Sequence, residues 1–316
     1  MTEIFVMKNS KGYWLTEFFT PTEKHSHLIK KFLVKKQTRF QKAILADSYS
    51  FKRCLVLDGE MQSAEFDEFI YHESLVHPPM MFLEGQAREI LIMGGGEGAT
   101  ARELLKYKSV SRITMVDIDG EVVDFAKKYL TGWHKGSFHN KKVEVVIDDA
   151  KKYIEDSPDG KFDLIISDLP TPIEGGPAYL LYTLEFYKTL KKKLKPGGVF
   201  AAQAGSGNLL QYKFHSMLCA TLKKIFGEVM PYYAYVPSFD VPWAFLIATD
   251  LDRKKIHLSA GQVDSILNRS FNKKQNLRFY DGLTHEGLFA IPKLYRDILR
   301  NEKRIISSRR PVFFFK

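Results

Sequence analysis

The sequence has little cysteine and no long apolar run. Its two cysteines, Cys54 and Cys219, each lack another cysteine at a metal-ligand spacing, so neither a disulfide framework nor a structural zinc site is supported. No apolar run approaches the roughly 18 residues of a membrane-spanning helix. The start, Met1-Thr2-Glu3, lacks the basic and then apolar layout of a signal peptide. We therefore expect a soluble, cytoplasmic protein in a reducing compartment, without a membrane partner.

Acidic residues are fewer than basic ones. Lys and Arg number 47 and Asp and Glu 37 among 316 residues, a formal net charge of +10, which would suit nucleic-acid binding if the cations clustered. The basic runs are short, dispersed and mostly at expected helix ends, where cations interact favourably with the helix dipole. They are residues 191–193, 223–224, 254–255 and 309–310. A solvated basic surface explains them better than a nucleic-acid partner.

The first eighty residues are β-rich. With 45% hydrophobic residues, a chain of this length can bury one large core or two smaller ones. Three runs alternate or carry β-branched and aromatic residues, as strands do: residues 12–19, 38–47 and 54–57. The lysines between the first two runs are spaced as on the exposed face of a short helix over residues 28–34: Lys30, Lys31, Lys35 and Lys36. We expect residues 1–80 to form a small β domain that ends in a helix from Asp67 to Met81, stopped by Pro78-Pro79.

After residue 88, apolar strands and helices alternate. The strands are expected at residues 89–93, 112–116, 143–147, 162–167 and 198–203, and the helices at 99–107, 121–129, 150–155, 184–194 and 210–226. Such alternation indicates a parallel sheet covered on both faces. Two further runs, 229–236 and 244–249, are joined by a loop too short for a crossover helix and should pair antiparallel. We expect residues 81–316 to form an α/β, doubly wound, Rossmann-like domain of the methyltransferase type, with a helical tail.

A glycine-rich turn follows the first of these strands and opens a helix. Its residues are Gly94-Gly95-Gly96-Glu97-Gly98-Ala99-Thr100, where glycines let the backbone pass close to a ligand. Asp117 ends the second strand, 21 residues after Gly96, where a carboxylate can accept both hydroxyls of a ribose. Asp148-Asp149 ends the third strand, where a carboxylate can accept a hydrogen bond from the exocyclic amine of adenine. Helix capping is the alternative for these acids, but the agreement of three strand ends favours a nucleoside site.

The rim formed by these strand ends is acidic. Glu97 inside the glycine loop would repel a pyrophosphate, which argues against a dinucleotide oxidoreductase. Asp168 ends the fourth strand, so the rim holds four acids: Glu97, Asp117, Asp149 and Asp168. This concentration predicts a cationic ligand.

Short motifs over about residues 40 to 250 extend this pattern. They are Leu57-Asp58-Gly59 with Gln62, residues 67–73, the glycine loop, residues 116–119, Asp148-Asp149-Ala150, Asp168, and residues 181–183 with Phe186-Tyr187. On these residues the chain resembles the polyamine aminopropyltransferases of the spermidine synthase family. The resemblance implies transfer of an aminopropyl group from decarboxylated S-adenosylmethionine, as co-substrate, to a small cationic amine, leaving methylthioadenosine. It also implies a homodimer or homotetramer joined through the N-terminal sheet. The sulfonium already activates the leaving group, so no metal or prosthetic group is expected.

The resemblance assigns roles to single positions. Asp168 matches the family's catalytic acidic residue, whose carboxylate would take the proton of the attacking amine. Positions that match nucleoside contacts are Gln41, Gly94, Gly95, Gly96, Glu97, Asp117, Asp149, Ala150 and Pro177. Positions around the aminopropyl chain and acceptor are Gln62, Tyr71, His72, Asp168, Thr171 and Phe239. Ordinary helix packing is the alternative for Tyr71 and His72, and core packing is the better interpretation of Tyr182, Phe186 and Tyr187.

The sequence departs from the family pattern near the acceptor. The usual Asp-x-x-Asp-Pro is here Asp168-Leu169-Pro170-Thr171-Pro172, so a hydroxyl replaces one anchor for a cationic amine. Glu174 could restore that charge. Residues 173–177, 203–205 and 236–239, with Phe239 in place of a tyrosine, resemble the thermospermine and agmatine-using branches. Putrescine is the leading acceptor, with spermidine, agmatine and cadaverine left open, and a methyltransferase acting on S-adenosylmethionine is the more distant alternative.

Overall fold

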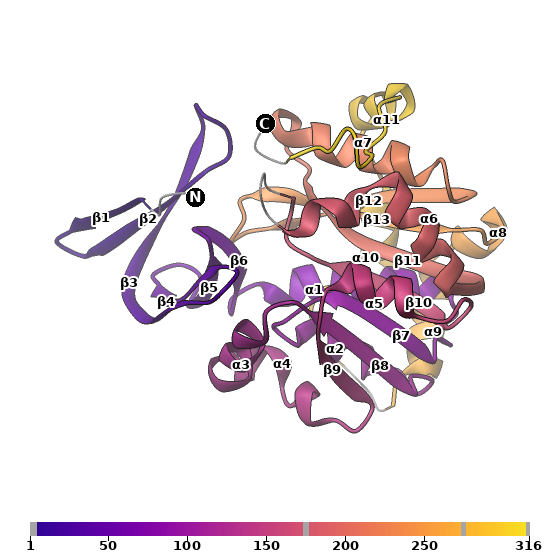
Figure 1. Cartoon of the computed structure of the whole chain (residues 1–316), viewed down its shortest axis with the longest axis horizontal. Helices are drawn as coiled ribbons and strands as arrows, with labels where there is room; N and C mark the ends of the chain where they lie inside the picture. Colours follow the sequence, from indigo (N-terminus) through magenta and orange to yellow (C-terminus); the bar gives the residue numbers. More distant parts are fainter. Residues whose placement is uncertain (1–4, 173–176, 273–275, 314–316) are drawn as a thin grey trace.

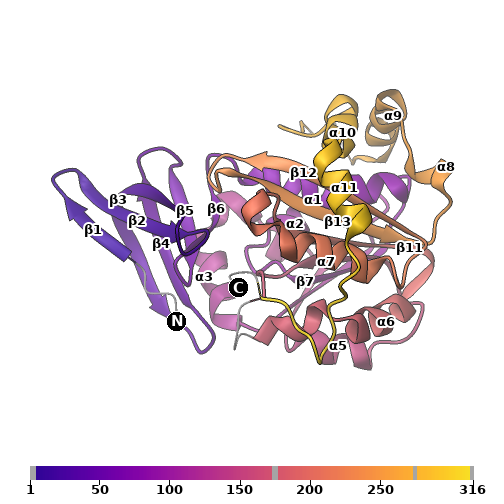
Figure 2. The same ribbon diagram turned by 90° about the horizontal axis from the view of Figure 1, so that it is seen from above.

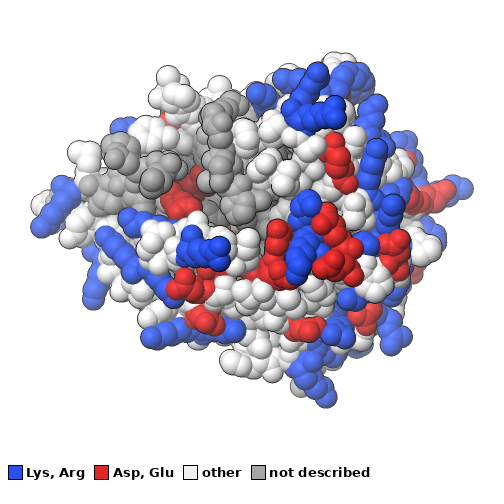
Figure 3. Space-filling model, viewed as in Figure 1, with Lys and Arg blue, Asp and Glu red and all other residues white. Residues whose placement is uncertain are grey.

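The computed structural model describes residues 5–172, 177–272 and 276–313. An N-terminal antiparallel sheet lies beside a larger, mostly parallel sheet that is covered by helices on both faces (Figures 1 and 2). This is the α/β arrangement expected from the sequence. In the described part of the chain, no helix has the length and apolar character needed to cross a membrane. On the face seen in Figure 3, Lys and Arg are interspersed with acidic residues rather than gathered into one patch.

The N-terminal sheet has six strands in sequence order. They are β1 (Phe5–Asn9), β2 (Gly12–Phe18), β3 (Lys24–Gln37), β4 (Lys42–Ser48), β5 (Arg53–Leu57) and β6 (Glu60–Ala64). The short helix predicted over residues 28–34 is wrong, because that segment lies within β3 and pairs with β2 and β4. The register of β3 against β4 shifts between Ile29 and Lys31 and between Phe32 and Val34. Such irregularities break strict alternation, which is why the lysine spacing imitated a helix.

Helix α1 (Glu68–Phe82) connects the two sheets and continues through both of its prolines, contrary to the predicted stop. Proline at position 78 removes the hydrogen bond that the carbonyl of Ser74 would accept within the helix. Tyr232 Oη donates to this carbonyl instead at 2.9 Å. The last turn, Pro78 to Phe82, is buried. Tertiary packing and this substitute hydrogen bond therefore outweigh the cost of the prolines.

The larger sheet has the strand order β12-β13-β11-β10-β7-β8-β9. Its strands are β7 (Glu89–Gly94), β8 (Arg112–Asp117), β9 (Val143–Ile147), β10 (Phe162–Asp168), β11 (Leu194–Ser206), β12 (Glu228–Val236) and β13 (Val241–Thr249). The strands from β11 to β9 are parallel, whereas β13 is antiparallel to both β11 and β12. The predicted antiparallel end of the sheet is confirmed.

Helices cover the two faces of this sheet, and alternate strand residues supply the two cores. Ile90 and Ile92 face α1, α2 (Ala99–Leu104), α9 (Ala260–Ser270) and α10 (Gly282–Phe289). Leu91 and Met93 face α5 (Ala150–Asp156), α6 (Leu184–Lys193), α7 (Tyr212–Leu222) and α11 (Lys293–Asn301). The remaining helices are α3 (Gly120–Tyr129), α4 (Thr131–His134), α8 (Arg253–Ile256) and the 3₁₀ turns η1 (Ser137–His139), η2 (Pro177–Tyr182) and η3 (Leu209–Gln211). The predicted core packing of Tyr182, Phe186 and Tyr187 is confirmed by their burial.

Two apolar seams fix the N-terminal sheet against the larger domain. In one, Leu45 and Leu55 pack with Phe125 and Trp133 of α3 and α4. In the other, Val56 and Met61 belong to a cluster that includes Phe239 at the tip of the β12–β13 hairpin. Each buried aliphatic or aromatic side chain contributes roughly 1.5–3 kcal/mol. The second seam also includes Ile70 and Tyr71, so it holds β6 and the hairpin against α1.

Candidate active site

The candidate site lies at the carboxyl ends of the parallel strands, where the chain changes direction in the sheet. From β7 the chain proceeds to β8 and β9 on one side, and later returns to β10 and β11 on the other. Asp168 is directly opposite Gly94 in the β10–β7 register, and Gly95 N donates to Asp168 O at 3.1 Å. Ligands of open α/β sheets bind at such switch points.

Asp168 is held by two hydroxyl groups. Tyr71 Oη of α1 donates to Oδ1 at 2.7 Å, and Thr100 Oγ1 of α2 donates to Oδ2 at 2.6 Å. Burial and the neighbouring Asp168 hold the pKa of Tyr71 well above its usual value, so the phenol stays a donor. Both carboxylate oxygens therefore have a fixed orientation at the end of β10.

The glycine loop brings the backbone against two of the acids. Gly95 has a φ of +73°, a left-handed conformation that glycine adopts without strain. A Cβ at Gly96 would stand 2.8 Å from Asp117 Oδ2. Gly96 thus leaves the Asp117 carboxylate room to lie against the loop.

Glu97 connects the loop to the N-terminal sheet. Ser63 Oγ of β6 donates to Glu97 Oε2 at 2.8 Å and accepts from Trp133 Nε1 of α4 at 2.9 Å. The pKa of Glu97 is raised to about 7, mainly by burial, with His72 and Ser63 lowering it and the charges of Asp168 and Glu68 raising it. A cation beside Glu97 would relieve this repulsion.

Asp117 and Gln41 meet a second carboxylate at the end of β8. Burial raises the pKa of Asp117 to about 6, although its Oδ1 accepts from Asp119 N at 2.9 Å. Asp119 caps α3 through Oδ1, and its Oδ2 accepts from Thr38 Oγ1 at 2.6 Å and from Gln41 Nε2 at 3.1 Å. The Gln41 side chain is therefore held by Asp119, and the backbone of Asp119 in turn contacts Asp117.

Asp149 and Ala150 lie at the other end of the rim, after β9. Asp149 is exposed and caps α5, with Oδ1 accepting from Lys151 N at 2.7 Å. Ala150 is buried as the first residue of α5. The capping alternative considered for Asp149 is thus present in the structure.

His72 lies one residue after Tyr71 on α1 and is almost fully buried. Its Nδ1 is 2.8 Å from Glu68 O and 2.9 Å from Glu68 Oε2. Two acceptors at Nδ1 require this nitrogen to carry the proton. Burial lowers the pKa of His72, but the hydrogen bond that Nδ1 donates to the Glu68 carboxylate and the charge of Glu68 outweigh it and raise the pKa, and the charges of Glu97 and Asp168 add to the rise.

The β12–β13 hairpin closes another side of the site. Asp67 accepts from Ser238 N at 2.6 Å and from Ser238 Oγ at 3.0 Å, which ties the hairpin to the start of α1. Phe239 consequently packs edge-on to Tyr71, with ring centroids 6.2 Å apart.

The segment after β10 carries the acceptor-side predictions. Tyr182 Oη donates to Pro170 O at 2.9 Å, and Thr171 is buried. Gln62 of β6 is half-buried and donates weakly to Glu60 O at 3.4 Å. Glu174 lies outside the described residues. Pro177 begins η2.

The structure brings part of the predicted site together. The charges of Asp168 and Glu97 both raise the pKa of His72, and the charge of Asp168 raises the pKa of Asp117 and of Tyr71. Gln41 and Asp149 make their contacts with Asp119 and with the α5 backbone instead. Among the described residues, no hydrogen bond joins Gln62 or Thr171 to these acids.

Sequence reasoning missed several residues that hold the acids. In the sequence Thr100 is recognisable only as the end of the glycine loop, and no local pattern distinguishes Ser63 or Trp133. Arg102 was missed too, although the charged pair Arg102-Glu103 between Ala101 and Leu104 is a signal that could have found it. Within residues 5–172, 177–272 and 276–313, no cluster of three or more His, Cys, Asp or Glu could hold a metal ion.

Comparisons with known proteins agree with this geometry. Residues 68–258 match the model of the spermine/spermidine synthase domain, and residues 13–65 match that of the spermidine synthase tetramerisation domain. A polyamine aminopropyltransferase of Sulfolobus acidocaldarius is 44% identical over 299 residues, covering 95% of this chain and 97% of its own. One of Aeropyrum pernix is 41% identical over 303 residues, covering 96% of each chain.

Solved structures give the same result. A spermidine synthase in complex with the transition-state analogue AdoDATO superposes with a TM-score of 0.83 at 28% identity, over 95% of this chain and 98% of that one. The spermidine synthase of Thermotoga maritima superposes with a TM-score of 0.81 at 28% identity, over 95% of this chain and 97% of that one.

Proposed function

Because the chain belongs to the spermidine synthase family of polyamine aminopropyltransferases, we propose that it transfers the aminopropyl group of decarboxylated S-adenosylmethionine to an amine. The products are an aminopropylated amine, methylthioadenosine and a proton. The observation that carries this proposal is the position of Asp168, held by Tyr71 and Thr100 beside other acids at the strand ends. Such a site suits two cationic reactants.

The nucleoside occupies the rim between β7 and β9 in this proposal. Asp117 accepts the ribose hydroxyls, Asp149 and Ala150 contact the adenine, and Gln41 and Pro177 complete the pocket. Gly94, Gly95 and Gly96 let the donor approach the backbone. The raised pKa values of Glu97 and Asp117 support a cationic ligand, since a positive charge favours the ionised carboxylates.

The chemical step is a displacement at the carbon bonded to the sulfonium. The acceptor is an alkyl ammonium with a pKa of about 10, so it must lose a proton to become a nucleophile. Asp168 attracts the ammonium and takes that proton as the nitrogen forms its bond to carbon. The carbon–sulfur bond breaks, and its electron pair stays on sulfur as a neutral thioether. Because the leaving group begins positively charged, the step needs no metal or prosthetic group.

The acceptor is most simply putrescine, which would make the protein a spermidine synthase. Tyr71, His72 and Gln62 surround the aminopropyl chain and the acceptor, and Phe239 packs on Tyr71 where a tyrosine hydroxyl would add polarity. Thr171 offers no charge for the distal ammonium of a diamine. The apolar Phe239 and the uncharged Thr171 favour the alternative acceptors, spermidine and agmatine.

We further propose a homodimer or homotetramer assembled through the β domain of residues 1–80, with residues 81–316 as the catalytic domain. The match of residues 13–65 to a tetramerisation domain supports this assembly. Several large apolar side chains of the domain are exposed in the single chain, as an interface requires: Met7, Trp14, Phe18 and Tyr49.

A product assay by mass spectrometry tests the proposal. Decarboxylated S-adenosylmethionine is offered with putrescine, cadaverine, agmatine or spermidine, and with no acceptor as control. Formation of methylthioadenosine together with an aminopropylated amine is the expected result, and the preferred amine identifies the acceptor. No product with any amine, alongside methyl transfer from S-adenosylmethionine, would move the function to the methyltransferases.

A further inference from the structure

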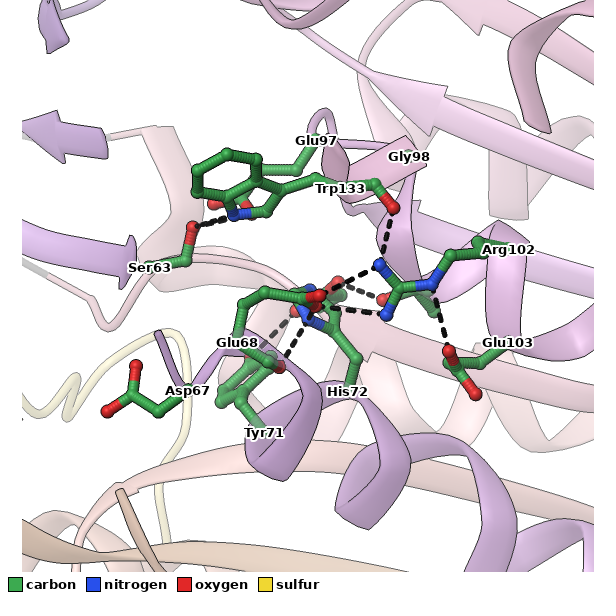
Figure 4. A network of polar contacts seen from close by, with 12 residues as sticks. Ser63, Asp67, Glu68, Tyr71, His72, Glu97, Gly98, Arg102, Glu103 and Trp133 are labelled. Atoms are coloured by element: carbon green, nitrogen blue, oxygen red, sulfur yellow. Dashed lines mark hydrogen bonds and ion pairs between the residues drawn. The ribbon is translucent and has the colours of Figure 1, made fainter. Parts of the chain in front are cut away.

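One guanidinium lies behind the site without facing it. Arg102 of α2 is 9% exposed and uses its three nitrogens in four hydrogen bonds (Figure 4). Its partners belong to α1, to α4 and to its own helix. None of the steps proposed above employs Arg102.

The first arm of this network leads to His72. Arg102 Nη1 and Nη2 donate to Glu68 Oε1 and Oε2 at 3.0 and 2.9 Å, a bidentate pair. Glu68 Oε2 in turn accepts from His72 Nδ1 at 2.9 Å. Because Arg102 fixes both carboxylate oxygens, it also fixes the plane in which the imidazole of His72 is held.

The second arm leads to Glu97. Arg102 Nη1 also donates to the carbonyl oxygen of Trp133. The indole of the same Trp133 donates from Nε1 to Ser63 Oγ at 2.9 Å, and Ser63 Oγ donates to Glu97 Oε2 at 2.8 Å. Arg102 thus holds Trp133, and the indole of Trp133 orients the Ser63 hydroxyl that donates to Glu97.

The guanidinium is itself held from behind. Nε donates to Glu103 Oε1 at 2.9 Å. Glu103 Oε2 is 3.0 Å from His77 Nε2 and 2.5 Å from Lys106 Nζ. Both carboxylates that flank Arg102 are therefore paired on their far sides, and the guanidinium has one orientation.

We propose that Arg102 is a positioning residue for the donor's aminopropyl chain, because it holds His72 through Glu68 and Glu97 through Trp133 and Ser63. This inference rests on the proposed function, in which His72 borders that chain. It adds that the Glu97 carboxylate, whose charge acts on His72, faces the same chain rather than the nucleoside alone. It predicts that Arg102 affects recognition of the aminopropyl part of the donor and leaves recognition of the nucleoside unchanged.

Lysine cannot reproduce this arrangement, although it keeps the charge. An ammonium is a point charge without the planar fork that satisfies two carboxylate oxygens and a carbonyl together. Arg102→Lys should therefore preserve the local charge and loosen both arms.

The test compares binding of two nucleosides by titration calorimetry, which needs no turnover. Decarboxylated S-adenosylmethionine carries the aminopropyl group, and methylthioadenosine lacks it. We expect Arg102→Lys to weaken the first about tenfold, the usual size of a coupling between contacting groups, and to change the second less than about twofold. Equal losses for both nucleosides, or no loss for either, would overturn the inference.

Two milder variants keep the test decisive if Arg102→Lys does not fold. Trp133→Phe removes the indole donor and Ser63→Ala the hydroxyl, and both variants keep the bidentate pair of Arg102 with Glu68. Each should weaken decarboxylated S-adenosylmethionine selectively. Combined with Arg102→Lys, where that variant folds, Ser63→Ala should add less than its separate effect, since both act on Glu97 through one arm. Unselective effects in both milder variants would refute the second arm.

A buried control separates positioning from stability. Tyr107→Phe breaks the hydrogen bond of 2.8 Å to His77 Nδ1 behind the network and touches neither arm. It should lower the melting temperature and leave both affinities unchanged. The same selective loss in Tyr107→Phe would overturn the inference. Native protein that binds neither nucleoside would instead contradict the proposed function, and the inference with it.

Discussion

Tyr71 and Asp168 lie 97 residues apart in the sequence and share a hydrogen bond of 2.7 Å, which joins α1 to the end of β10. The phenol donates to Oδ1, while Thr100 occupies Oδ2. The carboxylate thereby keeps one orientation in the site before any substrate arrives. Preorganisation of this kind is what a general base needs.

Asp168→Asn should abolish most turnover and spare nucleoside binding. An amide retains an acceptor oxygen for one of the two hydroxyl donors, so the local fold should persist, but it cannot take a proton at neutral pH. We expect kcat to fall about 100-fold or more. Steady-state kinetics and the dissociation constant of methylthioadenosine check both halves of this prediction.

The same strand supplies a matched control. Asp163 lies near the other end of β10 and accepts from Glu89 N at 2.8 Å and from Lys195 Nζ at 2.9 Å. Asp163→Asn should leave kcat within about twofold of native. If Asp168→Asn lost nucleoside binding as well, Asp168 would have a structural role instead.

The activity should depend on pH through Glu97. Burial raises the pKa of this carboxyl to about 7, so the ionised form that attracts a cationic donor exists mainly above that pH. The value of kcat/KM for the donor should therefore fall as pH drops below about 7, by up to tenfold per pH unit. A pH profile of kcat/KM at subsaturating donor measures this limb.

Ser63→Ala provides the directional check on that limb. Its hydroxyl donates to Glu97 at 2.8 Å and lowers the pKa of Glu97, because a hydrogen bond to the charged form favours ionisation. Without it the limb should move to higher pH. A limb that moves to lower pH, or stays in place, would show that another group controls it.

Most of the larger sheet could be predicted from the sequence, because its central strands β7, β10 and β11 are buried on both faces and consist largely of apolar residues. The strands expected at 89–93, 112–116 and 162–167 each extend by one residue in the structure. The acids that end them were placed at the rim by the same reasoning. Local patterns gave the wrong prediction where contacts distant in the sequence determine the conformation. In β3, pairing with the neighbouring strands makes the lysine-rich segment a strand. At Ser74, the carbonyl accepts a hydrogen bond from Tyr232, which lies 158 residues away, and the helix continues through its prolines.

The support of the acids was beyond the reach of the sequence. Thr100 and Asp168 meet only because two parallel strands lie in register. Ser63 meets Glu97 only because an apolar seam packs β4 and β5 against Ala99, α3 and α4, and β6 pairs with β5. Short-range spacing contains no information about either pair, since tertiary packing creates both.

Thr171→Asp should change the choice of acceptor. The residue is buried just beyond Asp168, and a carboxylate there would attract the second ammonium of a short diamine. We expect the ratio of kcat/KM for putrescine to that for spermidine to rise about tenfold, the effect of one additional charge-assisted contact. Competition assays with both amines in one reaction measure the ratio directly.

Thr171→Asn is the control for this change, since it has similar size without the charge. It should leave the ratio near the native value. An unchanged ratio in Thr171→Asp as well would mean that Thr171 does not face the acceptor. Selectivity would then depend on Phe239 or on other residues of the pocket.

Gly96→Ala should damage the nucleoside site without unfolding the protein. The added Cβ would stand 2.8 Å from Asp117 Oδ2, closer than real contacts allow, so the carboxylate must turn away from the ribose position. We expect methylthioadenosine to bind about tenfold more weakly, as for the loss of a charged hydrogen-bond partner. Gly261→Ala on α9, where the new Cβ meets nothing within 4 Å, should bind normally. Equal affinity in both variants would remove Asp117 from the nucleoside site.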